Sequence, residues 1–340
     1  MKAAVLGAGS WATALACVLC DNGHEVTLWA RKDDVAREIC DDHTNSRYVP
    51  GHPLPEEIFA TTALKVALKD AQLVVYAVPS RAVRSVAEMA SPDIESDVIV
   101  AHAVKGFDLP SLDRISVMLG KVHPHHANRI CVISGPSHAE EVMEKLPTVL
   151  VTASLHHEMA RQVQHAFMNP YFRIYTQTDM VGVELGGSLK NIIALAIGIV
   201  DGLGFGDNAK AAVMTRGLAE IARLGKRLGA KESTFAGLTG VGDLIATCTS
   251  AHSRNLRAGR LIGQGVPSST VEKRVGMVVE GIPAVDAALA LAHQSGVEMP
   301  ITRALHAVLH DGLDPADAAE QLMERERRHE AEVEGPSYFW

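Results

Sequence analysis

The chain has 340 residues, enough for about two domains, and 47% of them are hydrophobic, as in an ordinary soluble globular protein. The formal net charge of −8 argues against nucleic acid and membrane surfaces as partners, and no apolar stretch reaches the ~18 residues needed to cross a bilayer. Five cysteines, an odd number, and an N-terminus without a signal-peptide pattern lead us to expect a cytoplasmic protein.

The first half of the chain alternates short β-branched runs with helical patterns. Several runs are apolar on consecutive positions, as in parallel strands covered on both faces, and the segments between them are long enough for crossover helices. We therefore predict a Rossmann-type, doubly wound α/β domain over residues 1–178. The predicted strands cover residues 3–6, 25–29, 73–78, 98–103, 130–134, 148–153 and 171–175.

Beyond residue 178 long helical periodicities replace the strand pattern, which predicts an all-α domain over residues 179–340. The predicted helices cover residues 183–200, 208–228, 256–262, 282–294 and 316–326. Asp207 is a candidate N-cap and Gly229 a candidate C-cap for the second of them. The tail, residues 325–340, is highly charged and then ends in Pro-Ser-Tyr-Phe-Trp, so we expect a loose or docking segment.

A glycine-rich turn follows the first predicted strand and opens a helix, with the sequence Gly7-Ala-Gly-Ser-Trp-Ala12. In this dinucleotide fingerprint Gly7 permits the tight turn, Gly9 lets the backbone approach a pyrophosphate, and Ala12 lets the helix pack on the strand. The helix N-terminus supplies N–H donors and a positive dipole. The alternative is a glycine turn that binds no ligand.

The end of the second predicted strand bears on the choice of cofactor. NAD-selective sites place an acidic residue there, whereas this chain has Arg31 and Lys32, and its acids Asp33 and Asp34 come slightly late. Two cations favour a ribose 2′-phosphate, so we expect NADPH rather than NADH. Two ordinary surface cations are the alternative.

Polar residues follow three further predicted strands, where ligands of open α/β sheets bind. Ser80 ends one strand and can cap the next helix. Lys105 follows another and points into the same crevice. Gly135 precedes Ser137, which forms a capping box with Glu140, and the same helix start can also bind an anion or hydroxyl.

Lys190 stands in unusual surroundings in the helical half, because the residues that follow it, 192–200, are all apolar or small. A buried lysine costs several kcal/mol unless it is paired, and it loses its proton more easily than a surface lysine. It can therefore act as an acid or base, or simply extend its head to the surface. Asp243, after three glycines, either caps a helix or holds Lys190.

A candidate phosphate site follows Asp243 in the sequence. Ser253 is a good N-cap, which places Arg254 and Asn255 in the first turn of a helix, where N–H groups point outward. Arginine offers phosphate a bidentate fork and asparagine adds a donor. Considered alone, an Arg-Asn pair at a helix start is more commonly an exposed surface pair than a phosphate site.

Two groups of histidines resemble metal-binding sequences, at residues 123–126 and 156–157. Neither has a cysteine or carboxylate at ligand spacing, so we expect no metal. Cys17 and Cys20 lie within an apolar helical pattern, which favours a buried helix face over a redox pair.

With these pieces in place, the chain resembles bacterial-type NAD(P)-dependent sn-glycerol-3-phosphate dehydrogenases over residues 2–310. The matching segments, in order, are Gly7-Ala-Gly-Ser10-Trp11-Ala12, Val78-Pro79-Ser80, Lys105-Gly106, Gly135-Pro136-Ser137-x-Ala139, Glu184-Leu-Gly-Gly-Ser-Leu-Lys190-Asn191, Gly202-Leu-Gly-Phe-Gly-Asp207-Asn208, Thr215-Arg216-Gly217, Gly240-x-Gly242-Asp243, Ser253-Arg254-Asn255 and Val278-Val279-Glu280-Gly281. Two positions depart from the family pattern, Val104 in place of threonine and His138 in place of phenylalanine. We expect both to affect fine geometry and turnover rather than the reaction class.

The resemblance implies reversible reduction of dihydroxyacetone phosphate to sn-glycerol 3-phosphate, which supplies phospholipid synthesis, with Lys190 as the catalytic acid/base. It implies cofactor contacts from Ser10, Trp11, Arg31, Lys105, Ala139, Arg254, Val278 and Glu280. It implies substrate contacts from Lys105, Gly135, Ser137, Lys190, Asp243, Ser253, Arg254 and Asn255. A homodimer is a family expectation.

Two alternatives stay open at this point. One is a related reductase, also built from a Rossmann domain and a helical domain, that acts on a keto or hydroxy acid such as ketopantoate. The other is a nucleotide-sensing module without turnover, against which the proton donor Lys190 argues.

Overall fold

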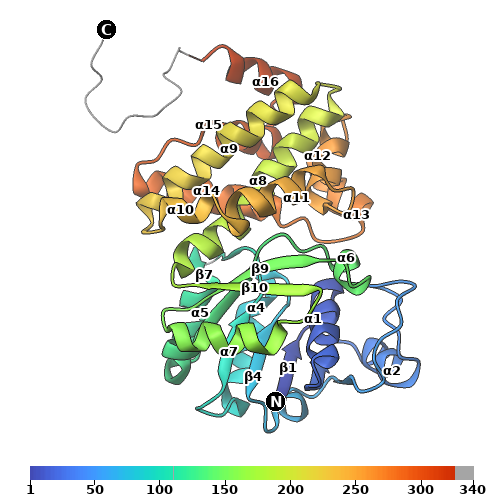
Figure 1. Ribbon diagram of the computed structural model, residues 1–340. Coiled ribbons are helices and arrows are strands. Elements are labelled where there is room, and N and C mark those ends of the chain that lie inside the picture. Colours follow the sequence, from blue (N-terminus) through green and yellow to red (C-terminus); the bar gives the residue numbers. More distant parts are fainter. Residues whose placement is uncertain (110, 326–340) are drawn as a thin grey trace.

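The computed structural model describes residues 1–109 and 111–325, so the predicted tail lies, from residue 326 on, outside the described residues. The strands and the first seven α-helices form one half of the molecule, and the helices from α8 onward form the other (Figure 1). This is the predicted order of an α/β half followed by an all-helical half.

The first half is built on an eight-stranded sheet with the order β10-β9-β8-β5-β4-β1-β2-β3. The sheet strands are β1 Lys2–Leu6, β2 Glu25–Trp29, β3 Phe59–Thr61, β4 Leu73–Tyr76, β5 Ile99–His102, β8 Ile130–Ser134, β9 Thr148–Ala153 and β10 Phe172–Gln177. The residue pattern did not predict the short edge strand β3 or the small hairpin of β6 (Phe107–Asp108) and β7 (Asp113–Arg114).

The sheet is not wholly parallel. The strands from β3 to β8 are parallel neighbours, whereas β9 pairs antiparallel with β8, and β10 runs parallel to β9. The link from β8 to β9 contains only the five-residue helix α6 (Ala139–Met143), whereas a parallel crossover usually carries a longer helix packed on the sheet. The chain therefore reverses direction and continues antiparallel.

Helices cover both faces of this sheet, as a doubly wound fold requires. The core on one face includes Leu15 of α1 and Phe167 of α7, and the core on the other includes Val83 of α4 and Met118 of α5. The helices of this half are α1 Ser10–Asp21, α2 Asp33–Asp41, α3 Leu64–Leu68, α4 Ser80–Ala90, α5 Ile115–Val122, α6 and α7 His157–Phe167, with 3-10 turns at Ser91–Asp93 and Pro124–Arg129.

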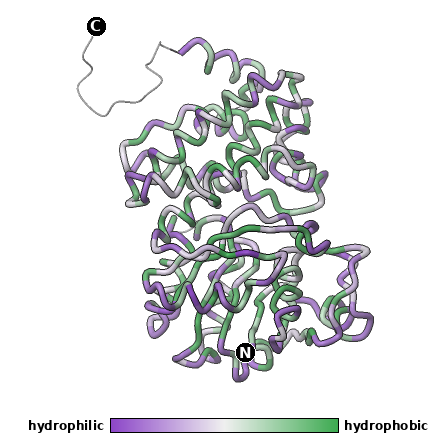
Figure 2. Tube along the Cα trace, in the orientation of Figure 1, coloured by the Kyte–Doolittle hydropathy of each residue, from purple (hydrophilic) through white to green (hydrophobic). Residues whose placement is uncertain are grey.

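The second half is organised around α8 (Met180–Gly202). The other helices are α9 Asp207–Arg227, α10 Glu232–Phe235, α11 Asp243–Thr249, α12 Arg254–Gly263, α13 Ser268–Val275, α14 Gly281–Ser295, α15 Pro300–His306 and α16 Pro315–Met323, with π-helical turns at Leu238–Gly242 and Ala307–Asp311. Hydrophobic residues gather along α8 and along the strands of the sheet (Figure 2).

By length and composition α8 could cross a membrane, contrary to the expectation from the sequence, but its apolar window is 100% buried within the structure. It is therefore the core helix of the second half. Its glycines let α12 pack closely, since a Cβ on Gly198 would collide with the backbone of Leu256, and one on Gly259 with the carbonyl of Leu195. This crossing brings the start of α12 near the catalytic candidate on α8.

Two predicted helix caps differ in the structure. Gly206, not Asp207, is the N-cap of α9, and Asp207 is its first residue, where it pairs with Lys210 at 3.1 Å. Ser80 is the first residue of α4 rather than its cap, and its hydroxyl instead donates to the carboxylate of Glu280 at 2.6 Å. At the other end of α9 the C-cap is Leu228, and Gly229, the predicted C-cap, is the next residue, at φ +93°.

Candidate active site

Lys190 lies within α8, where its side chain is only 7% exposed. Its ammonium donates hydrogen bonds to the carboxylate of Asp243 and to the hydroxyl of Thr247, both on α11. The other carboxylate oxygen of Asp243 accepts from Lys105 at 2.8 Å. One buried carboxylate therefore holds two lysines, one from each half of the chain.

The surroundings of Lys190 shift its proton affinity. Burial lowers the pKa of Lys190 from 10.5 to about 7, while the Asp243 carboxylate opposes this shift and the Lys105 ammonium adds to it. A group with this pKa can give up or take a proton near neutral pH, which is the property needed for a general acid or base.

The two lysines line a cavity of about 180 Å³, whose other lining residues also come from both halves of the chain. It is lined by Trp11, Lys105, Ser137, His138, Ala139, Glu140, Lys190, Asn191, Asp243, Thr247, His252, Ser253, Arg254, Asn255, Val278 and Glu280. Every predicted substrate residue except Gly135 lies in this lining, together with six of the predicted cofactor residues.

The β1–α1 turn has room for a dinucleotide. Gly7 has φ +126°, and a Cβ there would lie 2.7 Å from the carbonyl oxygen of Ala77, so only glycine fits. Gly9 is the N-cap of α1, and no atom lies within 4 Å of where its Cβ would be. No side chain caps the helix, so its first N–H groups have no side-chain acceptor and can donate to a bound pyrophosphate.

Neighbouring residues of this turn have internal roles. Ala12 is fully buried against the sheet, in keeping with its predicted packing. The hydroxyl of Ser10 donates to the carbonyl of Tyr48 at 2.8 Å, which ties the turn to the segment after α2. Trp11 extends from the same turn into the cavity.

Arg31, the predicted contact to a 2′-phosphate, is exposed after the end of β2 and does not line the cavity. In the described part of the chain, neither it nor Lys32 has an ion-pair partner. Both cations are thus available to a ligand that extends along the sheet edge from the turn at Gly9.

Arg254 is the first residue of α12 and lies in the cavity. Burial lowers the pKa of its guanidinium, and the charges of Glu140 and Glu280 oppose this shift. Among the described residues no hydrogen bond or ion pair engages the guanidinium, so a half-buried cation lies without a partner at the start of a ten-residue helix. This is the chemistry of a phosphate receptor.

The residues on either side of Arg254 are held by local bonds. The hydroxyl of Ser253 accepts from the N–H of Leu256 at 3.2 Å, so Ser253 is the N-cap, as predicted. The side chain of Asn255 donates to Asn191 at 2.9 Å and accepts from the N–H of Gly281 at 2.9 Å. Asn255 thus fixes α12 to α8 and α14.

The predicted capping box of Ser137 and Glu140 is wrong. His138 is the N-cap of α6 and uses no side-chain bond, and the hydroxyl of Ser137 donates instead to the carbonyl of Gly135 at 2.9 Å. Lys105 donates to the same carbonyl at 3.0 Å. Gly135 therefore acts through its backbone, because at φ +135° it turns this carbonyl toward the two side chains.

Glu280 reaches across the cavity to the other half of the molecule. Its carboxylate accepts from the N–H of Ser80 at 3.1 Å as well as from the hydroxyl, and burial raises its pKa. A Cβ on Gly106 would lie 2.6 Å from that of Ser80, so this glycine makes room for the contact. Val278 lines the cavity two residues earlier.

No role was predicted from the sequence for Thr247, Asn191 and His252, which line the cavity. Thr247 lies four residues after Asp243 on α11, a spacing that puts both on one helix face, so helical periodicity could have found it. Asn191 follows Lys190 directly, and only its partner Asn255, far along the chain, indicates what it does.

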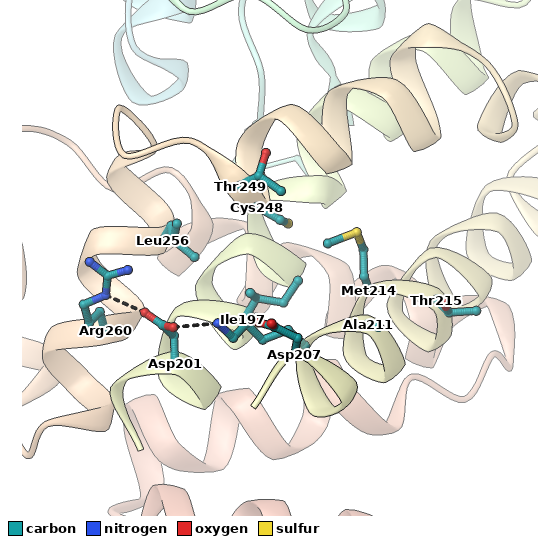
Figure 3. A pocket seen from close by; sticks show the side chains of 11 residues that line it. Ile197, Asp201, Asp207, Ala211, Met214, Thr215, Cys248, Thr249, Leu256 and Arg260 are labelled. Carbon is teal, nitrogen blue, oxygen red and sulfur yellow. Dashed lines mark hydrogen bonds and ion pairs between the residues drawn. The ribbon is translucent and has the colours of Figure 1, made fainter. Parts of the chain in front are cut away.

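A larger cavity of about 470 Å³ lies within the helical half, between α8, α9, α11 and α12 (Figure 3). Its charged groups neutralise one another, because Asp201 pairs with Lys210 at 2.9 Å and with Arg260 at 2.6 Å. It contains neither Lys190 nor Arg254, so the chemistry belongs to the smaller cavity.

Comparison with known proteins identifies the family. A family model described as the N-terminus of NAD-dependent glycerol-3-phosphate dehydrogenase matches residues 2–160, and the corresponding C-terminus model matches residues 179–320. The chain belongs to this family of NAD-dependent glycerol-3-phosphate dehydrogenases.

Curated relatives of this glycerol-3-phosphate dehydrogenase family match nearly the whole chain. A Bacillus cytotoxicus protein named glycerol-3-phosphate dehydrogenase (NAD(P)+) is 52% identical over 98% of this chain and 98% of its own length. A Shouchella clausii protein of the same name is 50% identical over 97% of this chain and 98% of its own length. The chain is accordingly an NAD(P)-dependent oxidoreductase.

Solved structures agree with this glycerol-3-phosphate dehydrogenase assignment. The Coxiella burnetii glycerol-3-phosphate dehydrogenase has a TM-score of 0.91 and 39% identity, over 95% of this chain and 99% of its own. A ketopantoate reductase from Ralstonia eutropha has a TM-score of 0.60 at 16% identity, over 95% of this chain and 100% of its own. The second likeness concerns the fold alone.

Proposed function

We propose that this protein reduces dihydroxyacetone phosphate reversibly to sn-glycerol 3-phosphate, with Lys190 as the general acid and, in the oxidation direction, the general base. The observation that carries this proposal is the bridge from Lys190 through Asp243 to Lys105, at the wall of the cavity that the β1–α1 turn also borders. Bound NAD(P)H supplies the hydride to the ketone carbon.

Lys190 and Lys105 have different roles at the substrate ketone. As hydride arrives, negative charge develops on the ketone oxygen, and the ammonium of Lys190 stabilises that charge and donates the proton. Lys105, held by Asp243 and by the Gly135 carbonyl, positions and polarises the substrate. Asp243 keeps Lys190 oriented and favours its charged form despite burial.

The substrate phosphate binds Arg254 and the N-terminus of α12, a local positive site in a protein of net charge −8. The cavity lining around this phosphate site also includes Asn255, Ser253 and Ser137. Residues 1–178 thus carry the dinucleotide turn and contribute Lys105 and Ser137 to the substrate site, and residues from 179 onward carry Lys190, Asp243 and Arg254.

The same proposal includes the preferred cofactor, the location of the enzyme, its metabolic role and its oligomeric state. The exposed Arg31 and Lys32 favour NADPH over NADH, since they can pair with a 2′-phosphate. We infer a cytoplasmic enzyme that supplies glycerol phosphate for phospholipid synthesis and acts as a homodimer.

The test is the substitution Lys190→Ala, assayed by NADPH and NADH oxidation with dihydroxyacetone phosphate. Loss of the proton donor should lower kcat by about 10²–10⁴-fold, while NADPH still binds with unchanged affinity, measured by nucleotide fluorescence. The exposed Lys69→Ala serves as the control and should retain wild-type turnover.

Near-wild-type turnover in Lys190→Ala would remove the assigned role. A wild-type enzyme that prefers ketopantoate over dihydroxyacetone phosphate would overturn the substrate, and tight NADPH binding without turnover on any keto-phosphate would point to a sensor.

A further inference from the structure

Three side chains with metal-binding atoms meet on the surface of the helical half. Asp286 lies on α14, His306 is the last residue of α15, and His310 lies in the π-helical turn Ala307–Asp311. Their ligand atoms all lie within 4.8 Å of one another, and none of the three lines the active-site cavity. In the ranges 1–109 and 111–325, this is the one such group of three.

The distances within this group suit a single ion. Oδ1 of Asp286 lies 2.9 Å from Nε2 of His310 and 3.8 Å from Nε2 of His306, so both rings turn the same nitrogen toward one carboxylate oxygen. A tetrahedral zinc ion with ~2.0–2.1 Å bonds separates its ligand atoms by about 3.3 Å. The two distances from Oδ1 of Asp286, 2.9 Å and 3.8 Å, lie below and above this value.

A second carboxylate supports one of the rings. Oδ2 of Asp311 lies 3.6 Å from Nδ1 of His306, the nitrogen that faces away from Asp286. Histidines that bind metals commonly donate their other N–H to a carboxylate, which fixes the tautomer and the ring orientation. His306 thus has a carboxylate on both sides of its ring.

The local backbone places the two histidines together. They are four residues apart across the junction of α15 and the π-helical turn, and their ring centroids are 4.7 Å apart. Gly312, at φ +74°, ends the turn. Short π-helical segments are rare and occur frequently at functional sites, which makes this turn a second structural observation for a site here.

We propose that Asp286, His306 and His310 bind a first-row divalent transition-metal ion such as Zn²⁺, with Asp311 orienting His306. Two imidazoles and one carboxylate are the ligands of such ions, whereas Mg²⁺ and Ca²⁺ require mainly oxygen ligands. The three residues leave a coordination position for water, as in other sites with three protein ligands. The ion would fasten α14, which begins directly after Glu280, to α15.

The experiment titrates full-length, chelator-treated protein with ZnCl₂ in an isothermal calorimeter. We expect a zinc site in the wild type that is lost in the double variant His306→Gln/His310→Gln and in Asp286→Asn. The matched control is His156→Gln/His157→Gln, which removes two exposed histidines elsewhere and should keep the site. Asp311→Asn should weaken the affinity by about 10–100-fold.

Thermal unfolding provides a second readout. Zn²⁺ should raise the midpoint of the wild type and of the control, but not of the double variant, while the metal-free proteins unfold alike. If the double variant binds Zn²⁺ with the stoichiometry and affinity of the wild type, the proposal is overturned and Asp286 and His310 form only an ion pair. MgCl₂ binding as tightly as ZnCl₂ at these residues would overturn the metal class.

Discussion

At the scale of single residues, Asp243 opposes the effect of burial on the protonation of Lys190. It is 1% exposed, and each of its two carboxylate oxygens accepts from a different lysine. If Lys190 is the proton donor, reduction needs its charged form and oxidation its neutral form. The activity in the two directions should therefore depend on pH in opposite ways.

We predict that kcat/KM for reduction falls as the pH rises through about 7, and that kcat/KM for oxidation rises over the same range, since the pKa of Lys190 is about 7. In Asp243→Asn the carboxylate that favours the charged lysine is absent, so both profiles should move to lower pH. The measurement is kcat/KM against pH in both directions, with the exposed Asp97→Asn as control. Unmoved profiles in Asp243→Asn would contradict this account.

Part of this site could be predicted from the sequence. The apolar run after Lys190 indicated burial, and burial demanded a partner, for which Asp243 was one candidate. That Lys105 shares the same carboxylate, and that Ser137 bonds to Gly135 rather than capping a helix, depends on how distant segments meet. Local patterns contain no information on such contacts.

At the scale of elements, the crossing of α8 and α12 positions the phosphate site. Gly198 and Gly259 face the backbone of the opposite helix, and the close approach brings Asn255 within hydrogen-bond distance of Asn191. Arg254 precedes Asn255 directly. The small side chains at this crossing therefore set where the free guanidinium lies.

We predict that Gly259→Ala lowers the free energy of unfolding by about 1–3 kcal/mol. The new methyl group would collide with the backbone carbonyl of Leu195, and the helix backbone cannot move aside without losing other contacts. The KM for dihydroxyacetone phosphate should rise, since α12 carries Arg254. Chemical denaturation and steady-state kinetics measure the two effects.

The matched control for this substitution is Gly120→Ala in α5, whose added Cβ meets Ile130 at an ordinary 3.6 Å. It should stabilise the protein by about 0.5–1 kcal/mol, because alanine is the better helix former. Equal effects of the two substitutions would show that the crossing is not tightly packed.

Elements differ in how well the sequence predicts them. Long periodic segments such as α8 and the buried strands β1 and β2 were found because their hydrophobic pattern is local. The antiparallel direction of β9 was not, because strand direction depends on how β9 pairs with β8 and not on its own residue pattern. The three-residue strand β3 is too short to show a pattern.

At the scale of the whole molecule, a buried carboxylate joins the two halves. Glu184 of α8 accepts from Arg114 at 2.5 Å and from both donors of Ser116, and Nε2 of His102 lies 3.2 Å away. Burial alone would raise the pKa of Glu184, but His102, Arg114 and Ser116 together lower it to about 2. The halves are thus fixed by charge as well as by apolar packing.

We predict that the wild type loses stability as the pH falls from about 4.5 to about 2. The pKa of Glu184 is lower in the folded state than its ordinary 4.5, so its contribution is complete above that value and lost below. Glu184→Gln should be less stable by about 3–5 kcal/mol at pH 7 and should show a shallower decline in acid. Denaturation at a series of pH values measures both, with the exposed Glu56→Gln as control.

The position of Lys190 also constrains the order in which the chain can assemble. The lysine lies on the central core helix, but its partners Asp243 and Thr247 come from α11, which is made later along the chain. Until α11 docks, packing α8 into the interior would bury Lys190 without the carboxylate that favours its charged form. Docking of α11 on α8 therefore completes both the core of the helical half and the charged state of the active site.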